Sequence, residues 1–137
     1  MKFFLLASFA LASLFGAMRS AEAADAQPRL FEMRTYVTHD GRLDALHARF
    51  RNHTNKLFAK HGIETIGYWV PTDEPASKNT LVYIVAYPSR EAREASWKAF
   101  GADPDWKAAK EASEADGKIV KQVITQFLAP TDYSGIK

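Results

Sequence analysis

The most constraining feature of the sequence is the alternation of apolar and polar side chains in residues 31–36, Phe-Glu-Met-Arg-Thr-Tyr. Successive side chains of a β-strand point to opposite faces, so this segment divides into two sets, Phe31, Met33 and Thr35 on one face and Glu32, Arg34 and Tyr36 on the other. We therefore predict a strand that helices cover on one face. Its other face must contact water, a protein partner or a ligand.

Residues 1–23 have the pattern of a secretion signal. Lys2 precedes an almost continuous apolar stretch over 3–17, and Ala21-Glu22-Ala23 matches an A-x-A cleavage signal. The stretch is shorter than the roughly 20 residues that a membrane-spanning helix needs, so a retained anchor is the weaker interpretation. We expect cleavage near Ala23, a mature domain of residues 24–137, and a periplasmic or secreted protein with no stable membrane anchor.

The composition excludes several classes of partner and chemistry. The full chain has a net charge of +2, and removal of the leader brings it closer to neutral. Nucleic-acid-binding domains usually carry a basic stripe, so we expect no nucleic-acid partner. The absence of cysteine excludes disulfides, cysteine nucleophiles and thiolate metal sites. Glycine-rich phosphate loops and a G-x-S-x-G turn are also absent, which argues against nucleotide and serine-hydrolase chemistry.

The four histidines do not predict a metal site. Those within one expected helix are six and eight residues apart, whereas two zinc ligands on a helix are typically four apart; the set is His39, His47, His53 and His61. We therefore expect no metal and no cofactor. A haem needs only one histidine, so haem stays open as an alternative, with His53 as the candidate ligand.

The rest of the pattern predicts four strands, over 30–37, 63–70, 80–87 and 118–128, and two helical regions. Apolar residues recur at helical spacing over 42–61, and Gly62 follows as a helix stop. Ser89 can cap a second helical region, which restarts where Asp103 is a cap and Pro104 the first helical residue. The order β-α-β-β-α-β predicts an α+β, ferredoxin-like antiparallel sheet with helices on one face.

We predict that the face without helices is strongly aromatic. Alternation assigns to it Glu32, Arg34 and Tyr36 together with Leu81, Tyr83, Val85 and Tyr87, while either Tyr68 or Trp69 would join them. A large aromatic surface is rarely left in water. A homodimer in which two sheets pack face to face is the simplest way to cover it.

Six short motifs occur in the order and spacing found in one family: Phe31-Glu-Met-Arg-Thr-Tyr36, Gly41-Arg-Leu-Asp44, Lys60-His-Gly62, Gly67-Tyr-Trp69, Ala86-Tyr-Pro-Ser-Arg-Glu-Ala-Arg93 and Asp103-Pro-Asp-Trp106. In these motifs the chain resembles NIPSNAP domains over residues 30–134. The resemblance implies a member of the dimeric α/β-barrel superfamily, of the bacterial single-domain type with a signal peptide. Relatives outside bacteria carry organelle-targeting leaders and often two domains. The family has no settled enzymatic reaction.

Arg34 is the first candidate site residue, because a guanidinium inside the barrel could bind a carboxylate through two parallel hydrogen bonds. The alternative is an ion pair with Glu32, which would lower the pKa of that carboxyl and disfavour it as a general base. The other tentative ligand-binding residues are aromatic and could equally serve packing: Tyr36, Tyr83, Tyr87 and Trp69.

These observations lead us to expect an exported domain that binds a small, partly apolar ligand inside a homodimeric barrel. No catalytic residue is assigned. The resemblance leaves one enzymatic alternative, because the superfamily includes cofactor-independent monooxygenases, isomerases and haem enzymes. A second alternative is a structural module that binds another protein.

Overall fold

The structure is a computed structural model that describes residues 28–137. The expected secretion signal and its cleavage site lie outside the described residues.

Four antiparallel strands form one sheet in the order β2-β3-β1-β4. Their bounds are Leu30–Thr38 for β1, Glu64–Trp69 for β2, Thr80–Tyr87 for β3 and Val120–Leu128 for β4. The two central strands are thus the first and third of the chain, and β2 and β4 form the edges. This arrangement confirms the predicted ferredoxin-like α+β fold.

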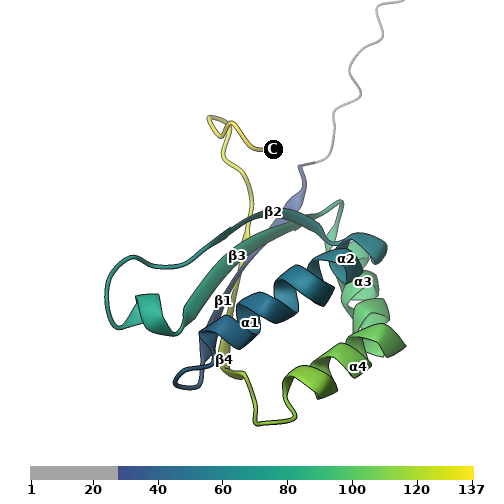
Figure 1. Ribbon diagram of the computed structural model, residues 1–137. Helices are drawn as coiled ribbons and strands as arrows, with labels where there is room; N and C mark the ends of the chain where they lie inside the picture. Colours follow the sequence, from purple (N-terminus) through teal and green to yellow (C-terminus); the bar gives the residue numbers. More distant parts are fainter. Residues whose placement is uncertain (1–27) are drawn as a thin grey trace, which may run out of the picture.

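The helices lie on one face of the sheet (Figure 1). The first helical region consists of α1 (Leu43–Arg49), a π-helical turn η1 (Phe50–Thr54) and α2 (Asn55–Lys60). The second consists of α3 (Arg90–Ala102) and α4 (Pro104–Ser113), and a short 3₁₀ helix, η2 (Ala76–Lys78), lies between β2 and β3. Both predicted caps are confirmed, because Ser89 accepts a hydrogen bond from the Ala92 amide and Asp103 accepts one from the Asp105 amide.

The predicted assignment of the two sheet faces was wrong. Arg34 lies opposite Tyr83 in the β1–β3 register. Tyr83 packs against Phe50 and Phe58 from the helical region, with ring centroids 5.3 and 6.1 Å apart. The set that contains Glu32, Arg34 and Tyr36 therefore faces the helices. Alternation identifies which residues share a face, but the pattern is the same whichever face the helices cover.

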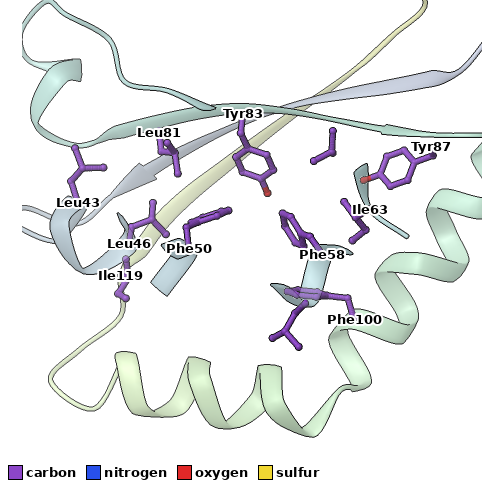
Figure 2. Packing of buried hydrophobic residues seen from close by; sticks show 12 residues of the cluster. Leu43, Leu46, Phe50, Phe58, Ile63, Leu81, Tyr83, Tyr87, Phe100 and Ile119 are labelled. Carbon is purple, nitrogen blue, oxygen red and sulfur yellow. The ribbon is translucent and has the colours of Figure 1, made fainter. Parts of the chain in front are cut away.

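The aromatic side chains fill the space between sheet and helices. Figure 2 shows Tyr83 pointing from the sheet toward Phe50 and Phe58, within a cluster that extends to Phe100. Tyr68 also belongs to this face, since its ring lies 5.4 Å from that of Phe50, whereas Trp69 points away and is 51% exposed. The ambiguity between these two neighbours is thereby settled.

The opposite face, which we call the open face, is mainly aliphatic. Alternation and register place on it Met33 and Val37 of β1, Val82 and Ile84 of β3, and Ile124 and Leu128 of β4. Ile124 and Leu128 are 44% and 38% exposed. No described helix covers this face (Figure 1).

Candidate ligand-binding site

A cavity of about 420 Å³ lies between the sheet and the helices. Six aromatic side chains line it: Tyr36, Phe50, Phe58, Trp97, Phe100 and Trp106. The remaining lining includes the charged side chains Arg49, Lys110, Glu114 and Lys118. The cavity thus combines aromatic walls with a polar rim.

Next to the cavity lies a buried carboxylate with a complete set of hydrogen-bond donors. Glu32 is fully buried and accepts one bond from Arg34 Nη1 at 2.7 Å and two from Arg93, at 3.0 Å from Nε and 2.8 Å from Nη2. Tyr87 Oη donates a fourth at 2.9 Å and itself accepts a bond from Trp97 Nε1. The cluster of Glu32, Arg34, Tyr87, Arg93 and Trp97 will be called the Glu32 cluster.

The surroundings of Glu32 keep it ionised. Burial raises the pKa of its carboxyl, but the hydrogen bonds from Arg93, Arg34 and Tyr87 outweigh burial and hold this pKa below its usual value. A carboxylate in this state is a poor general base. The pair with Arg34, which the sequence left open as an alternative, is therefore present.

Local structure explains how these groups meet. Ser89 fixes the start of α3, and the amide of Arg93 bonds to the Ser89 carbonyl one turn later. Arg93 consequently lies at the first turn of α3, where its guanidinium binds the carboxylate of Glu32 on β1 side-on.

Arg34 has unused hydrogen-bonding capacity. Its Nη2 donates to Tyr36 Oη at 3.3 Å, and its buried Nε has no partner among the described residues. Its guanidinium carbon also lies 4.3 Å from the centroid of Trp97. Burial lowers the pKa of Arg34, but Tyr36, Tyr83 and Glu32 raise it above its usual value, so the side chain remains charged.

Tyr36 brings the polar end of this network into the cavity. Its hydroxyl oxygen accepts bonds from Arg34 Nη2 and from Tyr83 Oη, the latter at 3.0 Å. Burial raises the pKa of Tyr83 well above its usual value, so Tyr83 keeps its proton. No hydrogen bond runs from Tyr36 to any acceptor within residues 28–137. Its proton is thus available to a molecule in the cavity that it lines.

The structure brings together five of the six residues predicted for the site: Glu32, Arg34, Tyr36, Tyr83 and Tyr87. Trp69 does not join them, because it lies on the other side of the sheet. Sequence reasoning missed Arg93 and Trp97. Their spacing from the Ser89 cap shows that both residues share one side of α3, but it does not show that this side meets Glu32 on β1.

Within residues 28–137, no three His, Asp or Glu side chains are grouped so that they could bind a metal ion. Over the same range, no helix has both the length and the apolar character needed to cross a bilayer.

The family model described as NIPSNAP matches residues 31–135. The chain belongs to the NIPSNAP family. This confirms the assignment made from the six motifs, and it makes the Glu32 cluster a feature of a NIPSNAP domain. A comparison with curated protein sequences gives no match.

Solved structures show the same fold. A NIPSNAP family protein from Agrobacterium tumefaciens is 21% identical with a TM-score of 0.69, over 80% of this chain and 99% of that chain. An uncharacterised NIPSNAP-like domain protein from Burkholderia xenovorans is 18% identical with a TM-score of 0.67, over 77% and 88%. A cofactor-independent oxygenase from Streptomyces nogalater is 12% identical with a TM-score of 0.52, over 79% and 98%. At these identities the likeness establishes a shared fold and neither a shared ligand nor a shared reaction.

Proposed function

We propose that this NIPSNAP-family protein is exported, forms a homodimer, and binds a small acid with an apolar body in the cavity between its sheet and helices. The observation that carries the proposal is the cavity itself, whose walls are aromatic and whose charged lining has a surplus of cations. The binding site lies within one protomer, whereas the sequence led us to expect it on the opposite face of the sheet.

The walls suit an apolar ligand body. Ligand cavities in proteins typically measure a few hundred Å³ and are lined by apolar and aromatic side chains with few polar groups. This cavity has that size and that lining. Its aromatic rings contact one another edge to face or at a tilt, as for Phe58 with Trp97 and Phe100 with Trp106, which leaves rigid walls for a planar or alicyclic molecule.

The charges favour an acidic ligand. Arg49, Lys110 and Lys118 line the cavity against one carboxylate, that of Glu114. Glu114 is already paired with Arg49 at 3.2 Å, and among the described residues no carboxylate lies within ion-pair distance of Lys110 or Lys118. At the inner end Tyr36 presents its free hydroxyl proton, supported by Arg34 and Tyr83. An anion would therefore meet donors at both ends.

The open face supports the homodimer. It is mainly apolar, although Gln122 and Gln126 of β4 also lie on it, and a single copy leaves Ile124 and Leu128 44% and 38% exposed. A hollow of about 340 Å³ lies on the same side, between Phe31, Ile66 and Ile84 of the sheet and the C-terminal segment 128–136. Apolar surfaces of this kind mark interaction sites, and a second copy offers a matching surface. Export rests on the leader pattern of residues 1–23.

Gly101 offers a way to test the cavity without damaging the fold. It lines the cavity from α3, and a Cβ added there meets no atom within 4 Å. Gly101→Leu should fill part of the cavity while improving helix propensity. Ala102→Leu, at an exposed position on the same helix, is the matched control.

Fluorescence titration with 2-naphthoate, compared with the neutral methyl 2-naphthoate, would test the proposal. We expect the naphthoate anion to bind the purified protein more tightly than the ester, Gly101→Leu to weaken binding by about tenfold or more, and Ala102→Leu to leave it unchanged. Equal binding by the native protein and by Gly101→Leu, or no preference for the anion over the ester, would contradict the cavity as the site.

The free proton of Tyr36 also favours a second candidate function, stabilisation of an enolate or oxyanion in the cavity. A hydroxyl that accepts two hydrogen bonds donates more strongly, because hydrogen bonds in a chain polarise one another. Such a donor matches what a developing oxyanion requires. Glu32 would not be the base in such a reaction, since its four donors hold it as a fully bonded carboxylate.

A further inference from the structure

We propose a second binding site, for a small carboxylate or phosphate-type anion, in a groove of about 260 Å³ between the first helical region and β2. Its polar lining consists of His47, Arg51, Asn55 and Tyr68, and its apolar lining includes Phe50, Trp69 and Leu81. We call it the donor groove. It does not depend on the proposed function, because its polar residues do not line the cavity between sheet and helices.

The helix geometry aligns three of the polar residues. His47, Arg51 and Asn55 are four residues apart, and in an α-helix each such step overshoots one turn by roughly 40°. The π-helical turn over Phe50–Thr54 has more residues per turn than an α-helix, so it reduces the angle between successive side chains of this set. All three side chains therefore reach the groove beside β2. Single π-turns of this kind occur frequently at functional sites.

A short hydrogen-bond chain orients Asn55. Tyr68 Oη donates to Asn55 Oδ1 at 2.6 Å, and Thr65 Oγ1 lies 3.2 Å from Tyr68 Oη. Because the single proton of Tyr68 is given to Asn55, Thr65 is the donor in the second bond. The chain therefore uses the oxygen of the Asn55 amide and leaves both amide hydrogens available.

Arg51 differs from every other arginine of residues 28–137. The others each contact a carboxylate or an aromatic ring: Arg29, Arg34, Arg42, Arg49, Arg90 and Arg93. Arg51 has neither kind of partner, and no Asp or Glu lines the groove. Its guanidinium, the Asn55 amide and the His47 ring thus provide hydrogen-bond donors with no anion to receive them. Carboxylates and phosphates match the planar donor set of a guanidinium.

Gly67 sets the position of Trp69, which lies on edge strand β2 opposite Val82 and also lines the groove. A Cβ at this position would lie 2.7 Å from the Trp69 indole, so glycine is what allows the ring to fold back over its own strand. Trp69 remains 51% exposed in that position. The apolar lining of the groove, Phe50 and Leu81 with Trp69 at the sheet edge, favours an anion that carries some carbon, such as an aromatic carboxylate, over a bare ion.

NMR titrations of the isotope-labelled protein with benzoate and, separately, with inorganic phosphate would test the site. We expect benzoate to shift the Asn55 side-chain amide and the Trp69 indole resonances. Weaker shifts with phosphate would indicate a preference for the carboxylate, and equal shifts would indicate general anion binding. Arg51→Gln should weaken this binding by about tenfold, the loss of a charge-assisted hydrogen bond. Lys56→Gln, which removes the same charge from an exposed neighbour outside the groove, should change it less than about twofold.

Each contrary result is informative. Equal losses of benzoate affinity in Arg51→Gln and Lys56→Gln would mean that the anion is attracted only by the general positive charge of this surface. The absence of shifts up to about 10 mM anion would contradict the site altogether. Loss of the shifts in Gly101→Leu would assign them to the cavity, whereas their retention would separate the two sites. A change of sedimentation in Arg51→Gln would show a contact between protomers in place of a ligand site.

Discussion

At the scale of single residues, the Glu32 cluster has an unequal distribution of charge. Arg34 and Arg93 both bind one buried carboxylate, and the second carboxylate near Arg93, that of Glu94, is 63% exposed. Removal of the Glu32 charge would leave the guanidinium groups of Arg34 and Arg93 without their buried carboxylate partner. Removal of the exposed charge would leave the cluster intact.

We therefore expect Glu32→Gln to lower the free energy of unfolding by about 3 kcal/mol, as the breaking of buried ion pairs does. Glu94→Gln, the matched control, should lower it by less than about 0.5 kcal/mol, because an exposed ion pair contributes little. Urea unfolding of the two variants would measure the difference. Similar values for both would contradict a central role for the Glu32 carboxylate.

The residue scale also shows where sequence reasoning succeeds. The pair of Glu32 and Arg34 could be anticipated because the two residues are neighbours on one face of a strand. Arg93 could not, since it reaches Glu32 only once α3 has been placed on the sheet. The same limit explains the wrong face assignment, because an alternating strand contains no information about which face helices will cover.

At the scale of elements, Asp103 joins three helices. It ends α3 and caps α4, and its carboxylate accepts bonds from Lys60 at 2.8 Å and from His61 at 2.6 Å at the end of α2. The side-chain bonds from Lys60 and His61 and the backbone bond from Asp105 hold the pKa of Asp103 far below its usual value. Sequence predicted the cap, but the bonds to α2 depend on how the helices pack.

This feature predicts a dependence of stability on pH. A carboxyl whose pKa is lower in the folded than in the unfolded state stabilises the fold fully above the unfolded pKa, near 4, and loses that contribution as the pH falls through the folded value. Asp103 and Glu32 both have this sign. Calorimetry should therefore show a melting temperature that falls between pH 7 and pH 3.

Asp103→Asn isolates the contribution of one carboxylate. The variant should melt lower than the native protein at pH 7. The gap should narrow toward pH 3, where the Asp103 carboxyl of the unfolded chain gains its proton while that of the folded protein stays ionised. Asp105→Asn changes an exposed neighbour and should show no such convergence. A gap that is constant with pH would mean that Asp103 acts through shape and not through charge.

The π-helical turn belongs to the same scale and illustrates a second limit of sequence reasoning. The apolar spacing over 42–61 predicts one continuous helix, and the helical region is indeed continuous along the chain. The extra residue in the turn over Phe50–Thr54 leaves Phe50 and Thr54 buried, as an α-helical turn would also allow. The pattern therefore does not distinguish the two kinds of turn.

At the scale of the whole molecule, the open face predicts the state of assembly. Sedimentation should give about twice the mass of one chain at micromolar concentration. Ile124→Lys places a charge on the open face and should shift the protein toward the monomer, because an unpaired charge is costly to bury in an interface. Ala99→Lys, at an exposed position on α3, should leave the mass unchanged. A native protein that sediments as a folded monomer would exclude the homodimer.

The separation of the cavity from the open face has a consequence for how ligand and assembly relate. The cavity lies among the helices of one chain, and the open face is the reverse side of the same sheet. Two copies joined by their open faces would each retain an entire cavity, so the two cavities of the dimer would bind ligand without cooperativity. By mass action, a ligand with equal affinity for monomer and dimer cannot shift the balance between them. Saturation of the cavity would then follow a simple hyperbola at every protein concentration.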